Sequence, residues 1–360
     1  MEKFTNSSSI NSTNFIDNQP YSYMDYFHPK FPKFLTIIFL VIGDFGNILS
    51  FFVFSKPSMR NNSVFIYFAF LSIVDLFVIT LGLGDIIIIS YFGIALRNES
   101  IIICRLHTFL TYLSTHLSSF VLASVSIDRA IALNSIHLSK IYCKPKMAKK
   151  VILFDFLLVF IINFHSLFFL GFYDTYDDGT SMTSSSYNTD ILQTTITTTT
   201  KQSISTTETF MCASREGSIY FSFLEKYFKY ADLICYAFLP FAIMIVCTIL
   251  IVRVLLLSTN KFKKNNGFSV KRKRNRQVTY SLIILNILFL CLVSPLVFVL
   301  AFIHIEQNMD SKIVYNIIYL LAYSNHCFNF IFYGISCPPY RSALMALLGF
   351  KKDQQLSTLN

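Results

Sequence analysis

Five polar residues interrupt long apolar stretches of the chain, and their types suit ion binding or hydrogen bonding rather than covalent catalysis. They are Asn47, Asp75, Ser118, Asn325 and Asn329. An ionised side chain at the centre of a membrane helix costs about 2.5–3.5 kcal/mol on insertion scales, so Asp75 in particular requires partners. Packed together, these groups could surround a monovalent cation such as sodium. A hydrogen-bonded network around a protonated Asp75 accounts for the same residues equally well.

Charge and proline mark further positions. The Asp128-Arg129 pair closes the third apolar stretch, where the guanidinium can bind its neighbour in one state and cytoplasmic groups in another. A boundary arginine that simply reaches toward the membrane surface is the alternative. Pro240 and Pro295 each remove a backbone hydrogen bond from a later stretch and bend it. Such bends suit helices whose inner ends swing outward, although membrane helices also tolerate proline without that role.

The sequence shows no residue pattern that is typical of an enzyme. Its seven histidines are scattered, and no nucleophile–base pair or metal-ligand spacing occurs. A formal net charge of +10 on a soluble protein would suggest nucleic acid, but here the basic residues lie between apolar stretches. We therefore expect no enzyme activity, no metal centre and no nucleic-acid partner, and no cofactor apart from a sodium ion near Asp75.

The composition requires a membrane to position these groups. Hydrophobic residues make up 54% of the chain and charged residues 14%, whereas soluble domains carry about 25% charge. A membrane-spanning helix needs roughly 20 apolar residues, and long runs that do not alternate are helices rather than barrel strands. Seven stretches qualify, which predicts an all-α membrane protein. They are Phe34–Phe54, Val64–Leu96, Ile101–Leu133, Val151–Tyr173, Tyr230–Leu257, Val278–His304 and Ile313–Ile335.

Basic residues predict the orientation of this bundle. Alternate connections, together with the C-terminal tail, carry 18 lysines and arginines and one acid, whereas the N-terminus and the remaining connections carry 9 bases and 13 acids. Because basic loops stay in the cytoplasm, the N-terminus is predicted to lie outside. The first 33 residues have no apolar core and do not resemble a cleaved signal peptide. The first helix would then be an uncleaved anchor in the plasma membrane, with lipid as its partner.

The same pattern divides the chain into parts. Residues 1–33 form an outer tail, 34–336 the membrane domain and 337–360 the cytoplasmic end. Within the membrane domain, residues 174–229 are a long Ser/Thr-rich outer loop that is expected to be largely disordered. Residues 258–277 are a basic inner loop, which sets the topology and attracts anionic lipid or contacts an effector directly. No internal repeat supports a transporter fold.

Cysteines and sequons are consistent with this orientation. Of the eight cysteines, only Cys104 and Cys212 fall outside, where thiols are oxidised, so we predict a disulfide between them. Two free thiols are the alternative. The sequons at Asn6, Asn11 and Asn98 lie on the predicted outer face and are candidate glycosylation sites.

Several short motifs occur in the order and at the spacing of one known family. They are Gly46-Asn47, Leu71-Ser72-Ile73-Val74-Asp75, Cys104 placed 25 residues before Arg129, Pro240, Pro295, Asn329-Phe330-Ile331-Phe332-Tyr333 and Tyr340-Arg341. Taken together, they resemble the rhodopsin-like (class A) family of G-protein-coupled receptors from Phe34 to about Phe350.

This resemblance implies roles for the residues above. It implies a seven-transmembrane bundle followed by a short amphipathic eighth helix that opens at Tyr340-Arg341. Asp75, Ser118, Asn325 and Asn329 would line the family's sodium pocket, near Asn47. Arg129, beside Asp128, and Tyr333 would be switches that meet the G protein, and Pro240 and Pro295 would match the family's prolines in the fifth and sixth helices.

The chain also departs from the family pattern. Ala130 stands where the family has the tyrosine of Asp-Arg-Tyr, and Phe330 replaces the proline of the seventh helix. The motif Leu292-Val293-Ser294-Pro295 lacks the family's tryptophan. Asn275 stands where some members carry an acid that locks the arginine. Without that lock, we expect signalling in the absence of a ligand.

The resemblance narrows the class of ligand that this chain is expected to bind. Thr111 stands where aminergic receptors hold an aspartate, and the seventh helix has no lysine for retinal, so monoamine receptors and opsins are disfavoured. The Asn329-Phe330 motif resembles neuropeptide receptors of the thyrotropin-releasing-hormone and FMRFamide types, including invertebrate members. A receptor of the same fold for a non-peptide ligand, including a chemosensory receptor, and a seven-helix transporter or channel remain alternatives.

The upper cavity is predicted to hold two carboxylates among aromatic and hydroxyl groups. This set would suit a peptide with a basic and an aromatic terminal residue. For Asp232, a solvated acid at the membrane interface is the alternative. Asp85 lies about 15 Å above Asp75, in the outer half of its helix, which favours a role in the cavity over contact with lipid. The Asp85→Asn substitution is therefore expected to weaken agonist potency more than surface expression. The predicted lining residues are Asp85, Thr111, Asp232, Tyr236, Phe298, Tyr319 and Tyr323.

Overall fold

A computed structural model describes residues 33–177, 206–262, 270–302 and 309–350. Helices dominate these segments. They are α1 (Lys33–Phe54), α2 (Ser63–Phe92), α3 (Ile101–Asn134), α4 (Ile136–Tyr142), α5 (Pro145–Asn163), α6 (Ser166–Phe169), α7 (Ile219–Phe223), α8 (Lys229–Leu233), α9 (Leu239–Phe262), α10 (Val270–Phe302), α11 (Met309–Cys327), α12 (Asn329–Ser336) and α13 (Pro338–Leu347). A 3₁₀ turn, η2 (Leu96–Asn98), precedes α3, and π turns η3 (Leu224–Phe228) and η4 (Ile234–Phe238) join α7, α8 and α9.

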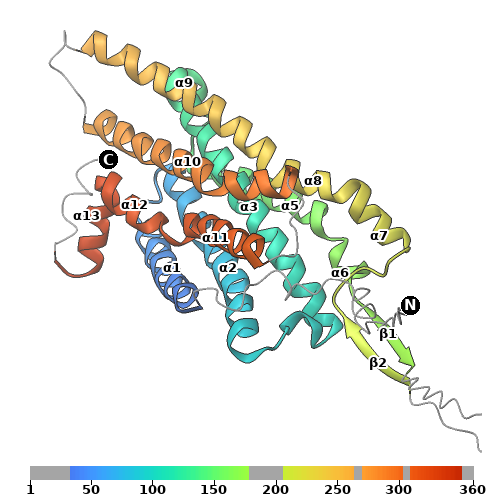
Figure 1. The fold of residues 1–360 in the computed structure, drawn as a ribbon. Coiled ribbons are helices and arrows are strands. Elements are labelled where there is room, and N and C mark those ends of the chain that lie inside the picture. The colour runs from blue at the N-terminus through green and yellow to red at the C-terminus, as the bar shows by residue number, and fades with distance from the viewer. Residues whose placement is uncertain (1–32, 178–205, 263–269, 303–308, 351–360) are drawn as a thin grey trace, which may run out of the picture.

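The long helices lie side by side as a bundle, in agreement with the predicted fold class (Figure 1). Six segments of the described chain are long and apolar enough to cross a membrane. The seventh passage consists of α11 and α12, separated at Phe328. It is less apolar because it carries buried polar side chains such as Asn316, Asn325 and Asn329. Large apolar side chains such as Phe45 and Phe154 are exposed on the outside of the bundle, as lipid contact requires.

Local signals in the sequence fix several helix ends. The side chain of Asn62 accepts a hydrogen bond from the backbone of Val64 and caps α2, and Ser100 caps α3 by accepting one from Ile103. The second helix ends at Phe92, four residues before the predicted end, because Gly93 adopts a left-handed conformation with φ of 68°. Pro145 stands in the first turn of α5, which therefore begins six residues before the predicted Val151.

A hairpin closes the end of the bundle that was predicted to face outward, hereafter the outer end. Strands β1 (Phe172–Asp177) and β2 (Thr206–Met211) pair in antiparallel fashion, with Phe172 opposite Met211. The predicted disulfide is present: Cys212, directly after β2, is bonded to Cys104 at the start of α3. The two ends of the long outer loop are therefore ordered strands, and α7 begins at Ile219, before the predicted loop end at residue 229. The expectation of disorder concerns mainly residues 178–205, which lie outside the described residues.

Aromatic side chains pack the opposite, inner end. Phe54 of α1 contacts the rings of Phe68, Tyr333 and Tyr340 at centroid distances of 4.9–5.5 Å. Tyr340 belongs to α13, so the predicted eighth helix is anchored to the bundle by this cluster. The hydroxyl groups of Tyr340 and Ser50 lie 3.0 Å apart and reinforce the contact.

Candidate functional site

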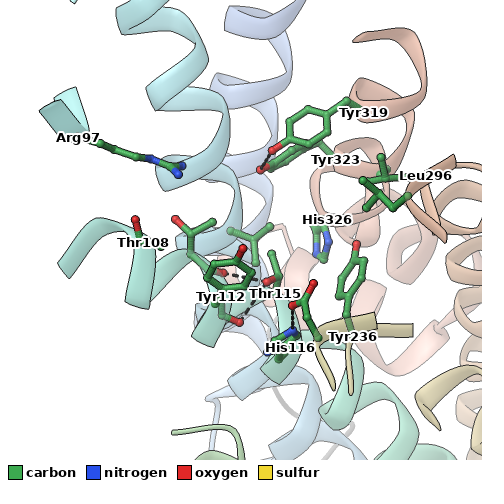
Figure 2. A pocket seen from close by; sticks show the side chains of 15 residues that line it. Arg97, Thr108, Tyr112, Thr115, His116, Tyr236, Leu296, Tyr319, Tyr323 and His326 are labelled. Carbon is green, nitrogen blue, oxygen red and sulfur yellow. Dashed lines mark hydrogen bonds and ion pairs between the residues drawn. The ribbon is translucent and has the colours of Figure 1, made fainter. Parts of the chain in front are cut away.

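A cavity of about 320 Å³ lies among the membrane helices, within the size range of small-ligand sites. Tyrosine, threonine and histidine side chains dominate its wall, and Figure 2 shows many of them pointing toward a common space. Its lining residues are Val78, Arg97, Thr108, Thr111, Tyr112, Thr115, His116, Asp232, Tyr236, Leu296, Leu300, Tyr319, Ala322, Tyr323 and His326. Five of the seven predicted lining residues are among them, and Asp85 and Phe298 are not.

Helical spacing explains how two elements supply most of this wall. Thr108, Thr111 and Thr115 follow one another at intervals of three and four residues and therefore share one face of α3. Tyr319 and Tyr323 share a face of α11 in the same way, and their hydroxyl oxygens lie 3.2 Å apart. Because this spacing is visible in the sequence, Thr108 and Thr115 could have been predicted from Thr111.

The carboxylate of Asp232 is the acid that reaches the cavity. It stands in α8, its side chain is 30% exposed, and its Oδ1 lies 2.8 Å from Nε2 of the buried His116. On the other side of the imidazole, the Asn163 amide donates to Nδ1 at 2.9 Å. A ring that accepts at Nδ1 carries its proton on Nε2 and donates it to Asp232. His116 therefore holds the Asp232 carboxylate in a fixed orientation at the cavity wall.

Asp85 was predicted as a second acid in the cavity, and the structure corrects this. Its side chain is buried, with 1% exposed, and Nε of Arg97 lies 3.1 Å from its Oδ2. Arg97 itself lines the cavity. The ion pair neutralises the Asp85 carboxylate, so the cavity presents the guanidinium side of the pair rather than a free acid.

Phe298 was also placed in the cavity, and its side chain instead faces away from the bundle. It is 57% exposed and contacts Phe302 one turn later. Its neighbours Leu296 and Leu300 line the cavity. Because each helical residue rotates the chain by about 100°, a residue two positions from Leu296 lies on the opposite face. Phe298 is therefore a lipid-facing residue.

The polar residues around Asp75 form the second cluster. Asp75 has no exposed surface, its Oδ1 accepts a hydrogen bond from Ser118 at 2.8 Å, and its Oδ2 accepts one from Asn329 at 2.7 Å. The Asn47 amide donates to the backbone oxygen of His326 at 3.0 Å rather than to Asp75. Asn325 is buried, and its Nδ2 has no hydrogen-bond partner.

Sequence reasoning missed the histidine of this cluster. Nδ1 of His326 lies 2.7 Å from Oδ1 of Asp75, and the same side chain lines the cavity. Figure 2 shows its ring among the side chains of the cavity wall. A histidine three residues before Asn329, one helical turn away, was the signal that could have found it.

The third cluster lies at the inner end of α3. Nε of Arg129 donates to Oδ2 of Asp128 at 2.9 Å, and the Arg129 Nη2 donates to Oγ of Ser63 at 3.1 Å. The Ser63 hydroxyl in turn donates to the same Asp128 oxygen at 3.0 Å. Both charged residues are buried, with 6% and 4% exposed, so the arginine is held against its neighbour in this state.

A thiol joins this cluster from the loop before α5. Sγ of Cys143 donates to the backbone oxygen of Asp128 at 3.2 Å. Burial, followed by the nearby Asp128 carboxylate, raises the pKa of the Cys143 thiol to about 11. The thiol therefore stays protonated at neutral pH and keeps its ability to donate.

The remaining predicted switch residues lie elsewhere. Tyr333 of α12 is buried in the aromatic cluster of the inner end, and its hydroxyl has no hydrogen-bond partner. Pro295 lies inside α10. Pro240 is the second residue of α9 and stands two residues after the end of the π turn Ile234–Phe238. Because proline lacks an N–H group and clashes with the preceding turn, the wider π turn accommodates it.

Of the predicted glycosylation sites, Asn98 lies in the described residues and Asn6 and Asn11 lie outside them. Asn98 is exposed at the outer end, and its Oδ1 accepts a hydrogen bond from the backbone of Cys212 at 3.2 Å. Its Nδ2, the atom that would carry a glycan, is not used in that bond. Asn275 lies in a part of α10 whose side chains are not described, so the missing lock on Arg129 stays a prediction.

Comparison with known proteins shows which family and which relatives this chain resembles. A family model described as 7 transmembrane receptor (rhodopsin family) matches residues 185–333. The FMRFamide peptide receptor frpr-18 of Caenorhabditis elegans is 25% identical over 136 residues, which cover 37% of this chain and 32% of that protein. G-protein coupled receptor 171 of Mus musculus is 34% identical over 134 residues, which cover 37% of this chain and 40% of that protein. The chain thus matches well under half of the length of either relative.

The family match and the architecture agree. The matched residues run from the long outer loop to Tyr333 in α12, and the apolar helices, the disulfide and α13 extend the same arrangement over the rest of the bundle. The resemblance to FMRFamide-type receptors is also confirmed by a relative of that name. Residues 185–333 of this chain are therefore similar to the rhodopsin family of seven-transmembrane receptors.

Proposed function

We propose that this protein is a plasma-membrane receptor that binds an extracellular peptide with a basic group and activates a heterotrimeric G protein. In this proposal the N-terminus and the hairpin face outward, and the Arg129 cluster faces the cytoplasm. The observation that carries the proposal is Asp232, an acid that lines the cavity, is partly exposed there and is held in place by His116.

The chemistry of the cavity supports a cationic and aromatic ligand. A basic side chain or terminal amine could form a charge-assisted hydrogen bond with the exposed part of Asp232. Tyr236, Tyr319 and Tyr323 offer ring faces and hydroxyl groups beside it. The C. elegans relative is named for a peptide ligand, which supports the same ligand class for this chain.

Replacement of Asp232 by asparagine tests the proposal. Cells that express the receptor are screened with a peptide library, and calcium release or G-protein dissociation is recorded. The Asp232→Asn variant is expected to lower the potency of cationic agonists about 10- to 100-fold, because a charge pair is lost. Surface expression should stay unchanged, since neighbouring His116 can also donate to an amide oxygen.

The matched control is Glu225→Gln, an exposed acid in η3 that does not line the cavity. It should leave potency unaltered. Equal potency for the Asp232→Asn variant and the wild type would reject a cationic contact at this acid. Activation by neutral non-peptide compounds alone would reject the peptide class.

A second test uses the space beside Tyr323. A Cβ atom at Gly82 would lie 1.9 Å from the Tyr323 hydroxyl oxygen, so Gly82→Ala must displace the end of that side chain. The loss of one hydrogen bond of about 1 kcal/mol predicts a roughly 5-fold lower potency of the agonist found in the screen. Gly84→Ala, which meets nothing within 4 Å, is the control. If both variants respond like the wild type, Tyr323 takes no part in binding.

A further inference from the structure

The environment of Asp75 decides whether a sodium ion can bind there. Three groups contact its two oxygens: the hydroxyl of Ser118 and the imidazole of His326 at Oδ1, and the amide nitrogen of Asn329 at Oδ2. They come from α3, α11 and α12, so three separate elements converge on one carboxylate. Nδ1 of His326 also lies 3.4 Å from the Ser118 hydroxyl and closes the group.

Sodium is a hard cation that requires several oxygen ligands with lone pairs directed at it. The Ser118 hydroxyl and the Asn329 amide nitrogen both donate to Asp75, so each of them occupies a lone pair of the carboxylate that an ion would otherwise use. Between His326 and Asp75 a single proton lies in the 2.7 Å contact, and it occupies a lone pair of Oδ1 whichever of the two atoms carries it. The backbone oxygen of His326 is used by Asn47. These residues therefore do not fit a sodium ion.

We propose that the imidazole of His326 takes the place of a sodium ion at Asp75, so that this receptor does not bind sodium there. The ring fills the side of the carboxylate that faces the cavity, because His326 both contacts Asp75 and lines that cavity. One side chain thus separates the cavity from the buried carboxylate. Anything that binds in the cavity against His326 acts on the Asp75 cluster directly, without an ion between them.

The substitution that reopens the site is His326→Ser. A serine is too short to reach Asp75, and its hydroxyl oxygen can accept as well as donate, which leaves both room and a ligand for an ion. Asp75 remains, with Oδ1 released from the imidazole. The variant is therefore expected to acquire the sodium binding that the wild type lacks.

Thermal unfolding of the purified full chain in detergent tests this without any agonist, so its outcome does not depend on the proposed function. The unfolding midpoint is measured in sodium chloride and in choline chloride at equal concentration. For wild type we expect equal midpoints in the two salts. For His326→Ser we expect a sodium-specific, saturable rise of roughly 2–4 °C when sodium exceeds its Kd about fivefold.

Two controls sharpen the result. His137→Ser, in the exposed part of α4, should behave like the wild type. Adding Asp75→Asn to His326→Ser should abolish the sodium effect. A saturable sodium-specific rise in the wild type would overturn the proposal. A folded His326→Ser variant whose unfolding midpoint does not respond to sodium would also overturn it, because something other than the imidazole would then exclude the ion. If His326→Ser does not fold, His326→Asn takes its place, and the sodium response of the wild-type midpoint remains a test of the proposal.

Discussion

Replacement of Gly46 by alanine is expected to destabilise the protein more than the same replacement at any other described helix glycine. A Cβ atom at this position in α1 would lie 2.0 Å from Cδ1 and 2.6 Å from Cγ of Phe330. Cγ is the ring atom next to the Phe330 backbone, so rotation of the ring cannot remove the clash. Helices α1 and α12 must therefore separate, at a cost of about 1–3 kcal/mol for an overpacked core.

The contact also shows how the side chain of Phe330 is accommodated. Phe330 stands where the family has a proline, and its larger side chain packs into the space that the absent Cβ of Gly46 leaves. The measurement is the thermal midpoint in detergent together with the surface level in cells. The same change at Gly84, which meets no atom within 4 Å, should not lower the midpoint.

A double substitution separates this cause from others. If the clash with Phe330 is responsible, Gly46→Ala combined with Phe330→Ala should lose less stability than the sum of the two single variants. Additive losses would show that Gly46 is required for another reason. A wild-type midpoint for the Gly46→Ala variant would contradict the packing of α1 against α12.

Replacement of Ser63 by alanine is expected to raise signalling in the absence of a ligand. Its hydroxyl accepts a hydrogen bond from Arg129 at 3.1 Å and donates one to Asp128 at 3.0 Å. Hydrogen bonds to charged groups contribute about 1.5–3 kcal/mol, so their loss weakens the state in which Arg129 is held. A shift of that size changes the population ratio about tenfold or more.

The matched control is Ser58→Ala in the connection just before α2, since the Ser58 hydroxyl has no hydrogen-bond partner. G-protein activation is recorded at equal surface expression, and the thermal midpoint is measured in parallel. We expect the Ser63→Ala variant to show higher basal output and a lower midpoint, and Ser58→Ala to show neither. Unchanged output with a lowered midpoint would mean that the cluster only stabilises the fold, and no change in either quantity would contradict the hydrogen bonds themselves.

Some features of this protein could be predicted from the sequence because they depend on the local sequence or on the redox state of the compartment in which a residue lies. Apolar stretches of about 20 residues require a membrane helix wherever they pack, and the predicted spans overlap the helices observed. The disulfide between Cys104 and Cys212 could be predicted because these are the two cysteines that the predicted topology places in an oxidising compartment. The predicted helix ends were less accurate where a local signal was overlooked, as at Gly93. They were also less accurate where π turns join successive helices, so that the helical segment begins at Ile219 rather than at the predicted Tyr230.

Other features depend on how each helix is rotated about its axis, which packing decides. Phe298 carries the right chemistry for the cavity and still faces outward, because the face of α10 that packs inward contains Leu296 and Leu300. Asp85 has the right depth, but Arg97, from the turn before α3, neutralises it.

The sequence by itself determined that the chain crosses a membrane, that Cys104 and Cys212 pair, and that Asp75 needs polar partners. Only the tertiary structure decided which partners these are. His326 is 251 residues from Asp75, and His116 is 116 residues from Asp232, so nothing local in the sequence links either pair. A buried acid takes whichever donor the neighbouring helices bring within about 3 Å, and that choice is made when the bundle packs.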